Sequence, residues 1–118
     1  MVLKMRKSPA ADMPMCPIGT CMELLGGVWT PNAIWHLSHG PRRFSELQTV
    51  MKPISAKVLS QRLKDLERKG VLTRAVMDTS PPSVEYALTD LGQELVPAIE
   101  AIAHVGFKLK QRQSQRAA

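Results

Sequence analysis

The spacing of apolar residues changes twice along this sequence, and this change restricts the fold more than any other feature. Between residues 17 and 69 apolar side chains recur every three or four positions, as they do on amphipathic helices. Between Val71 and Leu88 they alternate instead, which is typical of strands, and the helical spacing returns after residue 90. The sequence therefore predicts an α+β fold in which a two-stranded β-hairpin lies between helices.

Glycine, proline and hydroxyl residues divide the first part of the chain into short helices. Thr30 can cap a helix whose first position is Pro31, because proline needs no partner for a backbone N–H group there. Ser55 can cap another helix, and Gly70 can end it. The four expected helices span residues 17–25, 30–39, 44–51 and 55–69.

The fourth expected helix separates an apolar face from a polar face. Leu59, Leu63 and Leu66 share the inner face, and Val58 lies at its edge. The outer face carries Ala56, Lys57, Ser60, Gln61, Lys64 and Arg68. Three short helices, the last with such an exposed face, follow the order of a helix-turn-helix.

The second part of the chain is expected to form the hairpin and one long helix. The strands cover Val71–Met77 and Val84–Leu88, and the turn residues between them are too many for a two-residue turn. Thr89 can cap the last helix, at residues 90–112, in which Pro97 removes a backbone hydrogen bond and predicts a kink. The chain then divides into a flexible arm at residues 1–15, one domain at residues 16–112 and a frayed tail at residues 113–118.

The positive charge is concentrated in one part of the chain. The formal net charge of the 118 residues is +6, and residues 41–70 alone carry eight basic and three acidic side chains. This excess favours a polyanionic partner. An aromatic content of 4% argues against binding of single-stranded nucleic acid by stacking, and no apolar run approaches the roughly 18 residues of a membrane span. With two cysteines and no signal-like segment, we expect a cytoplasmic protein without a membrane partner.

The outer face of the fourth helix is the candidate surface for reading double-stranded DNA. A helix fits the major groove, where Gln can bond adenine at two atoms and Lys can reach guanine or phosphate. Lys57, Ser60 and Gln61 are the expected base contacts. The expected backbone contacts are Ser55, Lys64, Arg43, Arg68 and the hairpin residues Thr79 and Ser80. A winged helix that binds protein is the alternative, which the excess of basic residues disfavours.

The last helix carries more apolar surface than a monomer of this size can cover, and this predicts a dimer. Its stripe consists of Leu91, Leu95, Ile99, Ile102, Gly106 and Leu109, widened by Val96 and Val105. A two-fold partner helix is the natural cover. Such a dimer would place two recognition helices about 34 Å apart on one face of DNA.

Six segments in a fixed order carry a resemblance to a known family. They are Cys16-Pro17, LLGGVWT at 24–30, GPRRFSEL at 40–47, ISAKVLSQRLKDLE at 54–67, PPSVEYALT at 81–89 and LG at 91–92. With these segments the chain resembles the HxlR-type winged-helix transcriptional regulators of the MarR-like superfamily. The resemblance implies a cytoplasmic homodimer, joined through its first and last helices, that binds a pseudo-palindromic operator, most often as a repressor.

The chain departs from the family pattern at three places. After Thr30 it continues with Pro31, Asn32 and Ala33 instead of large aliphatic residues, so its second helix can start differently. Ser83 stands where the hairpin commonly has a basic residue, which weakens the expected hold on phosphate. The second cysteine, Cys21, is no part of the resemblance.

Cys16 is the candidate redox sensor. It stands at a helix N-terminus, where the helix dipole favours a thiolate, and the resemblance implies that a cysteine at this position senses oxidants or electrophiles in some members. A bridge to Cys21 is disfavoured, because residues five apart in a helix lie about 8–9 Å apart, beyond the limit of about 7 Å. The hypothesis is a disulfide between subunits. The alternatives are a small buried apolar residue at position 16 and a regulator that responds to a small-molecule effector without a thiol sensor.

The remaining notable side chains have structural interpretations. His36 and His39 have the spacing of metal ligands, but no nearby carboxylate or cysteine completes a site, so we expect no metal. Trp29 and Trp35 are expected to anchor the core, with a ligand pocket as the alternative. Arg42, like Arg43, either clamps phosphate or is solvated. No catalytic constellation or cofactor motif is present in the sequence, and a thiol enzyme built on Cys16 is the remaining enzyme hypothesis.

Overall fold

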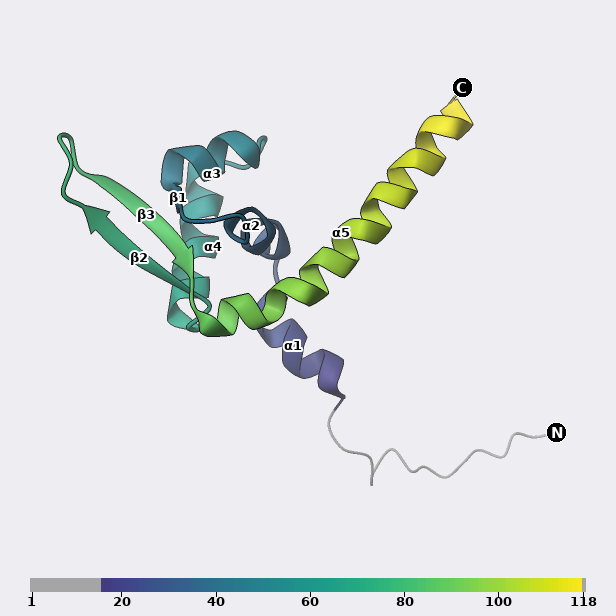
Figure 1. Ribbon diagram of the computed structural model, residues 1–118, viewed down its shortest axis with the longest axis horizontal. Coiled ribbons are helices and arrows are strands. Elements are labelled where there is room, and N and C mark those ends of the chain that lie inside the picture. The colour runs from purple at the N-terminus through teal and green to yellow at the C-terminus, as the bar shows by residue number, and fades with distance from the viewer. Residues whose placement is uncertain (1–15, 118) are drawn as a thin grey trace.

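The computed structural model describes residues 16–117, and the arm expected at residues 1–15 lies outside this part of the chain. Figure 1 shows a group of helices with a β-hairpin on one side and a long last helix on the other. The elements in chain order are α1 (Pro17–Leu25), α2 (Thr30–Leu37), β1 (Arg42–Arg43), α3 (Phe44–Val50), α4 (Ala56–Arg68), β2 (Leu72–Met77), β3 (Ser83–Leu88) and α5 (Asp90–Ala117). The predicted α+β class and the helix-turn-helix order are confirmed.

The local signals that surround α4 act as expected. The Ser55 hydroxyl oxygen accepts a hydrogen bond from the backbone N–H of Val58 at 3.1 Å, which satisfies a donor that the start of the helix leaves without a partner. The helix ends at Arg68, two residues before Gly70. Both ends of this helix are therefore specified by residues next to them in the sequence.

The start of α2 differs from the prediction by one residue. Trp29, in a left-handed conformation with φ 79°, is the N-cap residue, and Thr30 is the first residue of the helix. The Thr30 side chain is buried, and a Cβ atom on Gly27 would lie 3.1 Å from its Oγ1 atom. The expected capping role of Thr30 is wrong because its side chain packs inward.

A third strand joins the predicted hairpin. The order in the sheet is β1-β3-β2, and all neighbours are antiparallel. Arg42 pairs with Tyr86 and Arg43 with Glu85, so β1 ties the entry of α3 to the hairpin. The prediction of a two-stranded sheet is corrected by this pair of residues, which is too short to carry an alternating pattern.

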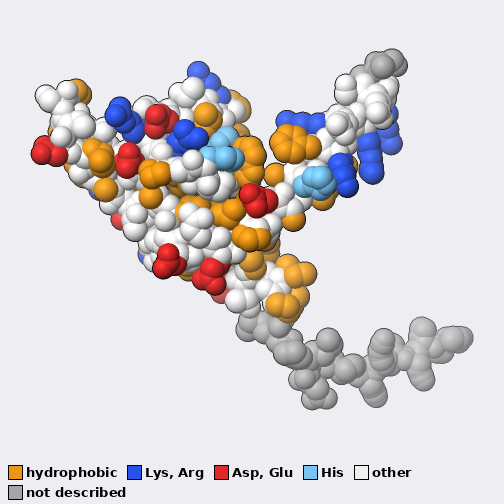
Figure 2. Space-filling view, in the orientation of Figure 1, with side chains coloured by type: hydrophobic (Ala, Val, Ile, Leu, Met, Phe, Trp, Pro, Cys, Tyr) orange, Lys and Arg blue, Asp and Glu red, His pale blue; other side chains and the backbone are white. Residues whose placement is uncertain are grey.

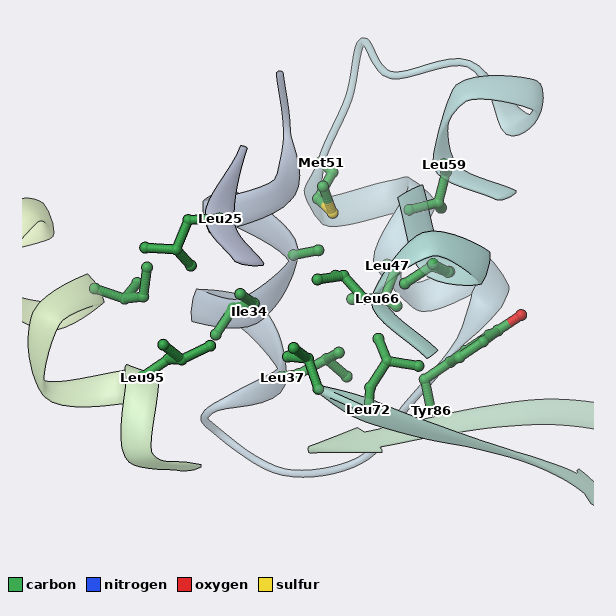
Figure 3. Packing of buried hydrophobic residues seen from close by; sticks show 14 of the residues in the cluster. Leu25, Ile34, Leu37, Leu47, Met51, Leu59, Leu66, Leu72, Tyr86 and Leu95 are labelled. Carbon is green, nitrogen blue, oxygen red and sulfur yellow. The ribbon is translucent and has the colours of Figure 1, made fainter. Parts of the chain in front are cut away.

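The core collects residues from each helix and from the sheet (Figure 3). In α4, Leu59, Leu63 and Leu66 are buried as predicted. In α3, Val50 is 52% exposed, and the core contacts come from Leu47 and the following Met51. The fully buried leucines hold α4 firmly against the other helices.

The last helix is longer than expected and leaves the core. It continues to Ala117, so residues 113–117 are helical where a frayed tail was expected. Pro97 lies inside the helix, and Figure 1 shows the first turns of α5 running at an angle to the rest. Leu95 and Ile99 are buried, whereas Ile102, Val105 and Leu109 are about half exposed. The second half of the apolar stripe is therefore uncovered in one chain.

Candidate nucleic-acid interface

The outer face of α4 carries three polar side chains that have no partner among the described residues. Lys57, Gln61 and Lys64 are exposed, and among residues 16–117 none of them has an ion-pair or side-chain hydrogen-bond partner. Ser60 is half-buried on the same side of the helix. Because the opposite face is packed by leucines, these groups are presented on a rigid scaffold, as major-groove contacts require.

Ser55 and Arg68 lie at the two ends of this helix and are partly engaged within it. The Ser55 oxygen caps the helix, which leaves its O–H group able to donate to a phosphate. Arg68, which is exposed, pairs with Asp65. The hydrogen bond from Lys69 lowers the pKa of Asp65, and the charges of Lys69, Arg68 and Arg62 lower it further, so Asp65 is an anion among these cations at neutral pH.

Two cations, one within α4 and one directly after it, turn away from the outer face. Arg62 Nε donates to the carbonyl oxygen of Val28 at 2.7 Å, and Lys69 Nζ donates to the carbonyl oxygen of Glu23 at 2.7 Å. Both residues belong to the basic excess of residues 41–70. A count of charges along the sequence does not show that they point away from the outer face. A helical wheel would have given the signal, because both lie on the flank of half-buried Val58.

The two arginines before α3 lie on β1 and have different surroundings. Arg42 is half-buried and Arg43 is exposed. The backbone N–H of Arg43 donates to Glu46 Oε1 at 2.8 Å, which caps the start of α3. Arg43 is therefore better placed than Arg42 to reach a phosphate.

The tip of the hairpin lies apart from α4 along the molecule (Figure 1). Thr79 and Ser80 are both exposed there, and Thr79 Oγ1 donates to the carbonyl oxygen of Pro81 at 2.8 Å. Ser83 is half-buried at the base of this loop. The cation of the hairpin is Arg74, which is exposed on β2 opposite Tyr86 and which sequence reasoning did not single out.

Cys16 is the N-cap residue of α1 and is exposed. The alternative of a small buried cysteine is therefore wrong for the single chain. Cys21 is half-buried on the same helix, and both thiols are free. Ile18 and Met22 of this helix are 69% and 49% exposed, so Cys16 borders an uncovered apolar face.

The two histidines flank an aromatic ring. The Trp35 ring lies edge-on to His36 and His39, with ring centroids 5.2 and 5.0 Å apart. Burial lowers the pKa of His36, and the nearby charges of His39 and Arg42 lower it further. Within residues 16–117 no group of three or more His, Cys, Asp or Glu side chains is placed to hold a metal ion.

Trp29 and Trp35 are half-buried and pack against the core, as expected for anchors. Trp35 also borders a hollow of about 300 Å³ between α2 and α5, and Trp29 is not part of its lining. Figure 2 shows hydrophobic side chains in the angle between α5 and the other helices, and again over α1. No helix among the described residues is both long enough and apolar enough to cross a membrane.

A helix-turn-helix with a β-hairpin wing and an exposed basic recognition helix defines the class of winged-helix DNA-binding transcriptional regulators. The HxlR-like helix-turn-helix family model matches residues 24–114. The chain belongs to this family, whose members are DNA-binding regulators and not enzymes.

Individual relatives agree with this assignment. The chain is 38% identical over 101 residues to the uncharacterized helix-turn-helix-type transcriptional regulator YdeP of Bacillus subtilis, covering 86% of this chain and 79% of that protein. The solved structure of the redox regulator HypR in its oxidized form is 31% identical, with a TM-score of 0.75, and covers 79% of this chain and 96% of that one. The reduced form of the transcriptional regulator YodB from B. subtilis is 35% identical, with a TM-score of 0.67 and coverage of 77% and 90%.

Proposed function

We propose that this chain acts as a homodimeric repressor that binds a pseudo-palindromic operator, with α4 of each copy in a major groove. The observation that carries this proposal is the outer face of α4, where Lys57, Gln61 and Lys64 are exposed and have no partner within residues 16–117. The base contacts are Lys57, Ser60 and Gln61. Lys64 and Arg68 contact the backbone from α4, Ser55 from the N-cap of that helix and Arg43 from β1. Thr79 and Ser80 contact it from the wing.

The distribution of charge on α4 favours DNA over a protein partner. The inward cations Arg62 and Lys69 already have carbonyl partners. Lys57 and Lys64, in contrast, have no partner in the described part of the chain and can bind phosphate or guanine. A groove that binds a protein needs no such free cations on its central helix, since protein interfaces are depleted in lysine.

Binding of the full chain to the DNA upstream of its own gene tests the proposal. Fluorescence anisotropy with this duplex and with a scrambled duplex of equal length, each at two salt concentrations, separates specific from general affinity. We expect selective binding to the upstream duplex. In a plot of the logarithm of the association constant against the logarithm of salt concentration, the slope should be about −0.9 for each phosphate neutralised. Absence of selectivity on this duplex and on a random duplex pool would contradict the proposal.

Two substitutions on α4 separate the roles of base and backbone contacts. Gln61→Ala should cost about 1–3 kcal/mol on the operator and relax selection at one base pair. Lys64→Ala should weaken all sequences alike and lower the salt slope by about one. Equal loss on specific and random DNA for both variants would show that the assignment of roles is wrong.

Repression is tested with a reporter gene placed behind the bound DNA. A recognition helix that occupies a promoter excludes polymerase, so reporter output should fall when the chain is supplied and recover with Gln61→Ala. Higher output with the chain present would identify an activator instead.

Exposed Cys16 supports a second part of the proposal, a response to oxidants. Two Cys16 thiols of a dimer would lose two protons and two electrons to hydrogen peroxide, forming one S–S bond and water. The likeness to the redox regulator HypR favours this signal over a small-molecule effector. Peroxide should give a dimer on a non-reducing gel and change operator affinity, in the chain and in Cys21→Ser but not in Cys16→Ser. A peroxide-treated chain that stays monomeric on the gel would count against the disulfide.

A further inference from the structure

The flank of α4 between its buried face and its outer face holds two cations that bind another element. Arg62 Nε donates to the Val28 carbonyl and Lys69 Nζ to the Glu23 carbonyl, each at 2.7 Å. Seven positions separate the two side chains, so they lie two turns apart on the same side of the helix. Both acceptors belong to the end of α1 and the turn that follows it.

These hydrogen bonds engage backbone groups that need partners. Glu23 lies in the last turn of α1, where carbonyl groups have no partner within the helix. A cation at this end also interacts favourably with the helix dipole. A Cβ atom on Gly27, whose φ is 105°, would lie 3.6 Å from Arg62 Nε, so the guanidinium packs directly over the turn.

Among the described residues, few side chains of α1 pack against the core. Leu25 is its buried residue, and Cys21 and Leu24 are partly buried against the core. Ile18 and Met22 face away from the core. Between the segment 17–29 and α4, the described side chains form two polar contacts, those of Arg62 and Lys69.

We propose that Arg62 and Lys69 are positioning residues that fix α1 to the recognition helix and thereby set the distance between the two recognition helices of the dimer. The proposal rests on the proposed function, in which the exposed face of α1 contacts the second copy. In the dimer, α1 contacts the second copy on one side and is bonded to α4 on the other. The position of the second copy therefore fixes the position of the recognition helix. One added base pair moves a half-site by about 3.4 Å and rotates it by about 35°, so a rigid attachment makes the protein select one half-site spacing.

Three duplexes and one double variant test this role. The duplexes are the operator that the wild-type chain selects from a random pool, the same operator with one base pair added between its half-sites, and the operator with one half-site scrambled. For Arg62→Met with Lys69→Met, we expect affinity for the operator to fall about tenfold while affinity for the single half-site stays within about twofold. The penalty for the added base pair should shrink from about tenfold to below about threefold.

Two further variants serve as controls. Arg68→Met removes one positive charge from the same helix, against two in the double variant. Because the partner of Arg68 among the described residues is Asp65 of α4 itself, affinity for all three duplexes should fall alike. Lys69→Arg keeps a donor at position 69 and should retain the selection of spacing. If the double variant instead behaves like Arg68→Met, with an equal loss on every duplex, the positioning role is overturned.

Hydrogen exchange of the full chain without DNA tests the attachment itself. In the double variant, amides of residues 17–29 should exchange at least about tenfold faster while those of β2 and β3 keep their rates. Unchanged exchange in residues 17–29 would overturn the proposal. Failure of the wild-type chain to select any operator would refute the proposed function and the role in spacing with it, whereas the exchange rates would still decide whether Arg62 and Lys69 hold α1.

Discussion

At the scale of single residues, the side chains of α4 differ in role according to the direction in which each one points. Lys57 and Lys64 are exposed and have no partner among residues 16–117, whereas Lys69 is bonded to a carbonyl of α1. All three are lysines in the same 13-residue helix or at its end, and composition cannot separate them. The periodicity of the helix predicted the outer contacts and the buried leucines, but the acceptor of Lys69 lies 46 residues away and is brought close only by packing.

The imidazole of His36 should make stability depend on pH. Its pKa lies below the ordinary value of 6.5, mainly because of burial. Between the folded-state pKa and pH 6.5, the unfolded chain therefore binds a proton at His36 that the folded chain does not. The stability that neutral His36 contributes is complete above pH 6.5 and is lost as pH falls through the folded-state pKa. We expect the urea midpoint to fall between about pH 7.5 and about pH 5.5, and to fall less in His36→Gln. An equal fall in both proteins would contradict this.

At the scale of elements, the start of α5 packs too closely on the hairpin for any side chain to fit between them. Thr89 Oγ1 donates to the Gly70 carbonyl at 2.6 Å and accepts from the Gly92 N–H at 3.2 Å, which ties the helix start to the end of the α4 segment. A Cβ atom on Gly92 would lie 2.3 Å from the Val71 carbonyl oxygen. The sequence predicted the Thr89 cap from its local pattern, but nothing in that pattern indicated the closeness at Gly92.

Gly92→Ala should therefore destabilise the fold by about 1–3 kcal/mol, because the backbone of residue 71 must move. Gly19→Ala in α1 is the matched control, since a Cβ atom there would meet nothing within 4 Å. The control should be neutral or stabilising by up to about 1 kcal/mol through helix propensity. Urea unfolding of both variants measures the difference, and equal stability of the two would argue against the close contact.

Elements that are specified by residues close in sequence were predicted, and elements that depend on distant residues were missed. The caps, the glycines and the apolar period predicted α1, α4 and the hairpin strands close to their observed bounds. β1 was missed because two residues carry no period, and only pairing with β3 makes them a strand. The first residue of α2 was misjudged because Thr30 is drawn into the core.

At the scale of the whole molecule, α5 extends beyond the body of the protein (Figure 1). One side of its second half is apolar and exposed in the single chain. Ile102, Val105 and Leu109 repeat at helical spacing and are 59%, 53% and 48% exposed. Adjoining apolar side chains of this size are uncommon on the surface of a monomer. The exposed residues of α1, Ile18 and Met22, add to the same apolar surface in a dimer of the kind proposed here.

Ile102→Asp should convert the dimer to a monomer, because a carboxylate would be buried without a partner in the interface. Gln111→Asp adds the same charge to α5 at a position off the apolar side and should stay dimeric. Sedimentation velocity of the full chain measures both, with circular dichroism as the check on folding. A folded Ile102→Asp dimer, or a monomeric wild-type chain at micromolar concentration, would contradict the proposed assembly.

Local pattern was sufficient for the class of fold, the bounds of the recognition helix and the outer residues of α4, because caps, breakers and periodicity act between residues close in sequence. Packing in three dimensions assigned the inward bonds of Arg62 and Lys69, the strand at Arg42 and Arg43 and the exposure of Cys16. Each of these features depends on which distant parts of the chain pack against the residue and which do not. Their partners, a carbonyl 34 or 46 residues away or a neighbouring strand, have no signature in the local sequence.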